Sequence, residues 1–185
     1  MQFDVLTALL ERSGMSQRAL QKKTGYSLGS VNKTLHELGD AGLVDGGAVS
    51  ASGLDALEPY RVKRAVIIAA GFGSRLVPVT LNTPKPLVRV NGKRIIDGIL
   101  DALLAACIED IVIVRGYLSE QFDQLLYKYP MIRFIENPAY NEANNISSAM
   151  CARYLLSEAY VCEADLLISN PAIIKKYNYR SNFLG

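Results

Sequence analysis

Residues 65–76 read AVIIAAGFGSRL, and this stretch decides the fold. Its first six residues are apolar without a polar interruption, which is typical of a strand buried on both faces of a parallel sheet. Two glycines, Gly71 and Gly73, follow immediately, and the loop then presents the cation Arg75. Ligands of open α/β sheets bind beyond the carboxyl ends of the strands. The stretch therefore predicts a buried strand that delivers a glycine loop to a binding edge.

The remainder of the second part of the chain alternates between strand and helix patterns. Short apolar runs predict further strands at 111–114, 132–135 and 160–162. Helical spacing of apolar residues predicts helices at 95–104, 122–126 and 149–156. This alternation predicts an α/β fold, with a mostly parallel, Rossmann-like sheet and helices on both of its faces.

Residues 1–60 predict a separate small α(+β) domain. Apolar residues repeat at helical spacing in three stretches, and either Ser27 or Ser30 is expected to cap the third helix. The sequence DGG at 45–47 is a hairpin signal. Helix, helix, turn, helix and hairpin follow the order of a winged helix-turn-helix domain, which leaves residues 61–185 as the α/β domain.

Composition excludes several classes of protein. Half of the residues are hydrophobic, yet no apolar run approaches the roughly 20 residues of a membrane helix. The N-terminus lacks the basic and then apolar pattern of a signal peptide. The three cysteines, Cys107, Cys151 and Cys162, lie far apart in apolar stretches, so we expect buried small hydrophobic residues rather than metal ligands. These features predict a cytoplasmic protein without membrane contact.

The glycine loop by itself leaves a simple tight turn as an alternative. It is not a dinucleotide fingerprint, because Leu76 stands where the third glycine would be, and no Gly-Lys-Ser/Thr follows as in a Walker loop. Its continuation favours phosphate binding, since the guanidinium of Arg75 can grip a triphosphate bidentately. Residues 61–185 also hold 15 Lys or Arg against 11 Asp or Glu, so the positive excess lies where an anionic substrate would require it.

A second motif lies ten residues further on, where residues 83–87 read TPKPL. Prolines on both sides of Lys85 stiffen the backbone and hold the ammonium group in one place. A fixed lysine beside a glycine loop suits the stabilisation of charge at a phosphorus atom under attack. A solvated surface lysine is the alternative.

Together, residues 69–76 (AAGFGSRL) and 83–87 resemble the signature of the sugar-phosphate nucleotidyltransferase superfamily. Residues 137–140 (NPAY) and 144–148 (NNISS) are similar to the narrower branch of CTP:phosphocholine cytidylyltransferases. The resemblance extends over roughly residues 64–170.

The resemblance implies which residues bind the nucleoside triphosphate, with CTP favoured. They are Ala70, Gly71, Phe72, Gly73, Ser74, Arg75, Lys85, Asn144, Asn145 and Ser148. It also implies catalytic roles for Lys85 and Arg75, contact between residues 144–148 and the base, and a Mg²⁺ ligand at Asp165.

The position of Asp165 agrees with a metal role, because a carboxylate directly after a buried strand lies at the binding edge and hard oxygen ligands suit Mg²⁺. A turn or helix-cap aspartate is the alternative. Residues 166–185 contain no Asp or Glu, so they lack the second metal-binding acid that the resemblance implies. We therefore expect that the C-terminal part of the transferase is absent and that this chain alone binds nucleotide but is inactive.

The leading functional hypothesis is transfer of CMP from CTP to phosphocholine, giving CDP-choline and pyrophosphate. Another sugar-1-phosphate nucleotidyltransferase, with a sugar phosphate acceptor, is the alternative enzyme. A winged-helix DNA-binding regulator with a degenerate nucleotide-sensing domain is the alternative of another class. DNA binding is not favoured, because residues 1–60 hold five Lys or Arg against seven Asp or Glu. Protein interaction or homodimerisation through this N-terminal domain is favoured instead.

Overall fold

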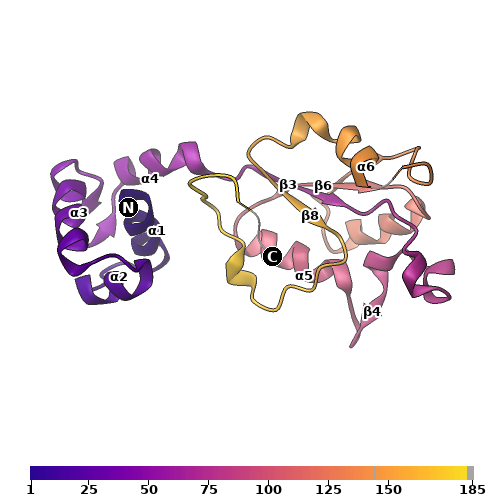
Figure 1. Ribbon diagram of the computed structural model, residues 1–185, viewed down its shortest axis with the longest axis horizontal. Coiled ribbons are helices and arrows are strands. Elements are labelled where there is room, and N and C mark those ends of the chain that lie inside the picture. The colour runs from indigo at the N-terminus through magenta and orange to yellow at the C-terminus, as the bar shows by residue number, and fades with distance from the viewer. Residues whose placement is uncertain (144, 183–185) are drawn as a thin grey trace. The chain divides into compact units, whose positions relative to one another are not determined.

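The computed structural model describes residues 1–143 and 145–182, which form two compact units (Figure 1). Met1–Arg61 and residues 177–182 make up the first unit, and Val62–Lys176 make up the second. The chain therefore passes from one unit to the other twice, after Arg61 and after Lys176.

The first unit has the winged-helix order that the sequence predicts. Its helices and strands are α1 (Gln2–Glu11), α2 (Gln17–Thr24), α3 (Leu28–Asp40), β1 (Val44–Asp45), β2 (Ala48–Val49) and α4 (Ala51–Leu57). The Ser27 hydroxyl accepts a hydrogen bond from the Ser30 amide at 3.1 Å, so Ser27 is the residue that caps α3. The antiparallel pair β1 and β2 forms a short hairpin.

The core of the first unit also contains residues from the far end of the chain. Tyr177 is buried among the apolar side chains of the helices. The amide of Asn178 donates to the carbonyl of Tyr60 at 2.8 Å. The ring of Tyr179 stacks on that of Tyr60, with centroids 5.2 Å apart. Residues 177–182, which the sequence analysis assigns to the nucleotide-binding domain, thus pack with the winged-helix helices.

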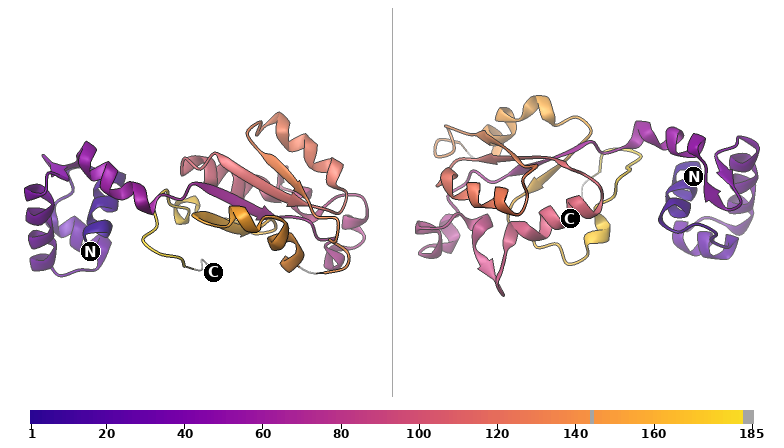
Figure 2. Two further views of the ribbon diagram at one scale, coloured as in Figure 1. Left: turned by 90° about the horizontal axis from the view of Figure 1, so that it is seen from above. Right: turned by 180° about the vertical axis from the view of Figure 1, so that it is seen from behind.

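The second unit is built on a parallel four-stranded sheet in the order β7-β6-β3-β8. The strands, β3 (Arg64–Ile68), β6 (Asp110–Arg115), β7 (Arg133–Glu136) and β8 (Ala159–Glu163), run side by side in both views of Figure 2. The central strand β3 is buried on both faces, as its unbroken apolar sequence predicts. The expected α/β architecture is confirmed.

Helices cover both faces of this sheet (Figure 1). Helix α5 (Ile95–Ala105) packs on the face that carries Ala65 and Ile67, while the segment that includes α6 (Asn145–Cys151) covers the face that carries Val66 and Ile68. Two details of the sequence prediction are wrong. The helix expected over 149–156 begins at Asn145, and the one expected over 122–126 is a 3₁₀ helix, Ser119–Tyr127.

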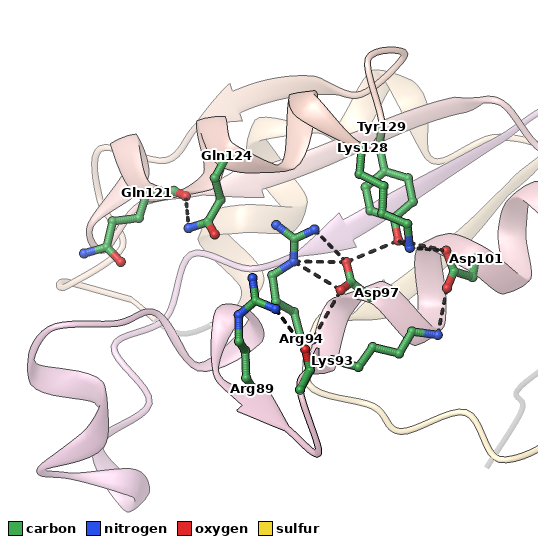
Figure 3. Close-up of polar contacts among 10 residues, drawn as sticks. Arg89, Lys93, Arg94, Asp97, Asp101, Gln121, Gln124, Lys128 and Tyr129 are labelled. Carbon is green, nitrogen blue, oxygen red and sulfur yellow. Dashed lines mark hydrogen bonds and ion pairs between the residues drawn. The ribbon is translucent and has the colours of Figure 1, made fainter.

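A polar network fixes the start of α5 and the preceding hairpin of β4 (Arg89–Val90) and β5 (Lys93–Arg94) (Figure 3). Arg94 and Asp97 form a buried ion pair, and the hydroxyl of Tyr129 donates to Asp97 and to Asp101. Partial burial raises the pKa of Asp101, but hydrogen bonds from Lys93, Lys128 and Tyr129 outweigh this and lower it to about 2. The network holds the hairpin, α5 and the end of the 3₁₀ helix together.

The expectation that the three cysteines are buried is wrong, because none of them is fully buried. Cys107 is exposed and lies in a tight turn with a left-handed backbone (φ 60°), whereas Cys151 and Cys162 are half-buried. Burial, with a smaller contribution from Glu163, raises the pKa of the Cys162 thiol to about 11, so it stays protonated at neutral pH. No helix within the described residues is both long and apolar enough to cross a membrane.

Candidate active site

A cavity of about 460 Å³ lies at the carboxyl ends of β3 and β8. It brings together segments that are far apart in the sequence: the glycine loop after β3, the proline-flanked lysine, the start of α6 and the end of β8. Eight predicted site residues line it: Ala70, Gly71, Gly73, Ser74, Arg75, Lys85, Asn145 and Asp165. This is the edge at which parallel α/β sheets bind their ligands.

Gly73 is the position in the loop at which glycine is required. Its backbone is left-handed (φ 70°), and a Cβ atom built there would lie 3.2 Å from the Cβ of Lys85 and 3.3 Å from the methyl carbon of Thr80. The buried hydroxyl of Thr80 donates to the Gly73 carbonyl at 3.1 Å. A Cβ atom built at Gly71, by contrast, would have no heavy atom of the described residues within 4 Å apart from its chain neighbours.

Lys85 is anchored by the residues that follow it. It opens the 3₁₀ turn Lys85–Leu87, in which the side chains of Pro86 and Leu87 are buried and Leu87 joins the core beneath α5. The ammonium group of Lys85 extends to the carboxylate of Asp165, with which it forms an ion pair. The two flanking prolines thus hold the lysine as the sequence predicts, and this lysine faces the predicted metal ligand.

The end of β8 supplies two acids to the cavity. The strand ends at Glu163, and the amide of Ala164 donates to the carbonyl of Ile68 at 3.1 Å, which keeps this segment against β3. Asp165 follows in a turn and pairs with Lys85. Glu163 also lines the cavity and accepts a hydrogen bond from the side-chain amide of Asn145 at 2.8 Å.

Three predicted nucleotide-binding residues stand apart from these. Asn144 lies outside the described residues. The ring of Phe72 packs edge-on against Tyr117, with centroids 4.7 Å apart, and so joins the glycine loop to the segment after β6. The hydroxyl of Ser148 is turned inward and accepts a hydrogen bond from the amide of Asn137 at 3.0 Å. In the described part of the chain, neither Phe72 nor Ser148 lines the cavity.

Two contributors to the site were not assigned roles from the sequence. Glu163 has no predicted role, but it lines the cavity and binds Asn145. Asn137 was noted only as part of a motif, but its buried amide donates to Ser147 and Ser148 and its oxygen accepts from Ala139, so it ties the end of β7 to α6. The sequence does show a polar residue directly after a predicted strand and before a proline. When such a side chain is buried, it must have hydrogen-bond partners, as Asn137 has.

In the described structure, some charged groups of the cavity already form an ion pair with each other, whereas Arg75 does not. Within the described residues Arg75 makes no ion pair, so its guanidinium is open to an anion. The carboxylate of Asp165 already holds a cation, the ammonium of Lys85. No cluster of three potential ligands of the His, Cys, Asp and Glu types occurs in the part of the chain that the structure describes. Asp165 therefore offers a single carboxylate. Mg²⁺ would need further oxygen ligands, such as the phosphate oxygens of a bound nucleotide, to complete its coordination.

The geometry agrees with the comparison of this chain with known proteins. Residues 64–180, more than half of the chain, match the family model described as nucleotidyl transferase. The chain belongs to the nucleotidyl transferase family. Residues 1–51 match a second family model, that of the MarR family, in agreement with the winged-helix order of the first unit.

This nucleotidyl transferase region is similar to several known enzymes. It is 45% identical to 2-aminoethylphosphonate cytidylyltransferase of Lancefieldella rimae, over 65% of this chain and 50% of the relative. It is 38% identical to CTP:phosphoglutamine cytidylyltransferase of Campylobacter jejuni, over 60% of this chain and 44% of that relative. The solved CTP:phosphocholine cytidylyltransferase of Streptococcus pneumoniae superposes with a TM-score of 0.59 and 42% identity, over 63% of this chain and 50% of that one. The chain spans about half the length of the relatives it matches.

Proposed function

We propose that this nucleotidyl transferase binds CTP in the cavity and transfers CMP to phosphocholine, giving CDP-choline and pyrophosphate. The observation that carries the proposal is the convergence of the glycine loop, Arg75, Lys85 and Asp165 on one cavity. The choice of CTP is supported by the similarity to three cytidylyltransferases. The choice of phosphocholine is supported by the solved relative from Streptococcus pneumoniae, while a phosphonate or a sugar phosphate is the alternative acceptor.

The reaction is an in-line displacement at phosphorus. A phosphate oxygen of the acceptor forms a bond to the α-phosphorus of CTP, and the bond from that phosphorus to the bridging oxygen breaks and releases pyrophosphate. Arg75 would grip the triphosphate, because its guanidinium is free to pair with phosphate oxygens. Lys85 would neutralise charge that grows on the reacting phosphate.

Asp165 is the residue that we assign to Mg²⁺. Its carboxylate attracts a cation, since the ammonium of Lys85 rests on it. When bound there, Mg²⁺ supplies neutralisation of the phosphate charges. Lys85 would then be released from its carboxylate partner to pair with a phosphate oxygen of CTP, if CTP binds in the cavity that Lys85 lines.

Calorimetry tests nucleotide binding directly. With Mg²⁺ present, we expect CTP to bind more tightly than ATP, GTP or UTP. Replacement of Arg75 by Met should weaken CTP binding by about tenfold to a hundredfold, the value of a charge-assisted hydrogen bond. Arg89→Met, at an exposed arginine of the β4–β5 hairpin, is the matched control and should bind like the wild type. Absence of binding to all four triphosphates would contradict the proposal.

For the winged-helix unit we propose protein interaction or homodimerisation rather than sequence-specific DNA binding. Residues 1–60 carry more acidic than basic side chains, and two of their cations are offset, because Lys23 pairs with Glu11 and Lys33 lies 3.8 Å from Glu37 on the exposed side of α3. The tip of its hairpin carries Asp45 and no cation. Phosphate contacts dominate the affinity of proteins for DNA, so such a surface is poorly equipped for it.

Gel-shift experiments at two salt concentrations separate these roles. We expect retardation of duplex DNA, if any occurs at low salt, to be lost at physiological salt, because few cations are available to release counterions. Sedimentation of the protein should show self-association that is independent of DNA. A sequence-selective shift that persists at physiological salt would contradict this proposal and favour the role as a DNA-binding regulator.

A further inference from the structure

Glu163 has no role in the reaction described above, although it pairs with Asn145, a predicted nucleotide-binding residue. Asn145 is the first residue of α6, and Glu163 is the last residue of β8. The amide nitrogen of Asn145 donates to one carboxylate oxygen of Glu163 at 2.8 Å, and both side chains line the cavity. An acid at this point is unfavourable for holding a triphosphate, because like charges repel. Its presence therefore calls for a function other than binding phosphate.

The carboxylate of Glu163 determines which way the side chain of Asn145 is turned. An ionised carboxylate can only accept hydrogen bonds, whereas a side-chain amide has one donating end and one accepting end. The NH₂ group of Asn145 must therefore face Glu163, and the opposite rotation would bring two oxygens together. The Oδ1 atom of Asn145 is consequently turned away from Glu163, and it is a fixed acceptor on a residue that lines the cavity.

A fixed acceptor discriminates between ligands that a freely rotating amide would bind with similar affinity. An unfixed asparagine can rotate by 180° and offer NH₂ to a carbonyl group or oxygen to an amine. Once its NH₂ group is held, a ligand that offers a donor gains a hydrogen bond, while one that offers an acceptor leaves polar groups unpaired. The discrimination thus originates at Glu163, although Asn145 makes the contact.

We propose that Glu163 is a positioning residue that holds Asn145 so that its Oδ1 accepts a hydrogen bond from a donor group of the bound nucleoside. The proposal rests on the function proposed above and deepens it by assigning part of the nucleotide specificity. Two groups of a cytidine nucleotide have the required chemistry: the exocyclic amine of the base and a ribose hydroxyl. Uracil differs from cytosine in carrying an acceptor in place of that amine, and deoxycytidine lacks the 2′-hydroxyl.

Calorimetric titration of the wild type and of Glu163→Gln with CTP, UTP and 2′-deoxy-CTP tests the proposal. The wild type should prefer CTP over at least one of the other two by about tenfold, the value of one discriminating hydrogen bond. In Glu163→Gln this preference should fall to within about threefold, because a glutamine amide can donate or accept and no longer fixes Asn145. Loss of preference over UTP assigns the donor to the base amine, and loss of preference over 2′-deoxy-CTP assigns it to the ribose.

Two further variants separate positioning from general effects. Asn145→Ala should lose the same preference as Glu163→Gln, since it removes the acceptor itself. Glu158→Gln is the matched control, because Glu158 precedes β8 at the opposite end of the strand, where it pairs with Lys63. This variant should keep the nucleotide preference of the wild type. A merely structural role of Glu163 would change the melting temperature and leave the ratio of affinities unchanged.

The outcomes are distinguishable from a failure of the proposed function. If the wild type binds none of the nucleotides, the proposed function itself fails and takes this inference with it. If the wild type binds nucleotides but Glu163→Gln retains the CTP preference, the inference alone is overturned. It is also overturned if Glu163→Gln changes the affinity for all three nucleotides by the same factor, because the carboxylate then acts through its charge.

Discussion

Replacement of Lys85 by methionine is expected to lower the rate of CMP transfer by about a hundredfold to a thousandfold, the loss seen when one donor to the developing charge of a transition state is removed. The affinity for CTP should change by less than about tenfold. The reason is geometric. Proline-flanked Lys85 lines the cavity and already pairs with a carboxylate, while Arg75 is free to bind phosphate in the ground state.

The measurement separates binding from chemistry. Because this chain alone is expected to bind nucleotide without turnover, the rate is measured in a longer protein that carries the whole transferase. Single-turnover transfer from CTP to phosphocholine gives the rate of the chemical step there, and calorimetry gives the dissociation constant. Lys63→Met is the matched control, because Lys63 is also an ion-paired lysine, with Glu158 at 2.8 Å, but lies at the opposite end of β3 and β8. The control should transfer CMP at the wild-type rate. Equal losses in affinity and in kcat/KM for Lys85→Met, at an unchanged kcat, would show that Lys85 only docks the substrate.

The main features of this site could be predicted from the sequence because each of them is local. An unbroken apolar strand, a glycine loop and a proline-flanked lysine are each specified within a dozen residues, and parallel topology then brings the ends of β3 and β8 together. The structure adds the reason why Gly73 must be glycine, since its backbone is left-handed and lies against Lys85. That contact joins two motifs that the sequence analysis treats separately.

Features that depend on side-chain contacts over a long distance could not be predicted. Periodicity places the helix of residues 149–156 too late, because α6 begins where the buried Asn137 binds the hydroxyls of Ser147 and Ser148. The same bonds turn Ser148 inward, although its motif suggests contact with the ligand. The pair of Asn145 and Glu163 becomes visible only once the start of α6 is known.

The return of residues 177–182 to the winged-helix unit is a further example. Nothing in the local pattern distinguishes an aromatic residue that completes the adjacent sheet from one that fills the core of another unit. Tyr177 is buried in the winged-helix core, more than a hundred residues along the chain from Tyr60, beside which it packs. Such pairings are set by the arrangement of whole elements, which a single sequence does not reveal.

Replacement of Arg94 by methionine is expected to destabilise the nucleotidyl transferase unit by about 3–5 kcal/mol, the usual result of removing one partner of a buried ion pair. The side chains of Arg94 and Asp97 are only 8% and 7% exposed, and their closest contact is 3.0 Å. Without Arg94 the carboxylate of Asp97 would remain buried, with only the Tyr129 hydroxyl and the backbone amide of residue 94 as donors (Figure 3). The loss should loosen the start of α5 and, with it, the turn that carries Lys85.

Hydrogen exchange of the α5 amides reports this loss without interference from the winged-helix unit, and urea titration gives the free energy of unfolding. Arg89→Met is the control, because Arg89 is an exposed arginine on the same hairpin that bonds only to the carbonyl of Gly92 in the described structure. It should change stability by less than about 0.5 kcal/mol, as exposed substitutions usually do. The double variant Arg94→Met with Asp97→Leu should recover much of the stability, because it leaves no unpaired buried charge. If the double variant loses as much free energy of unfolding as the two single variants lose together, the two side chains are not coupled. Each would then stabilise the fold through its packing alone.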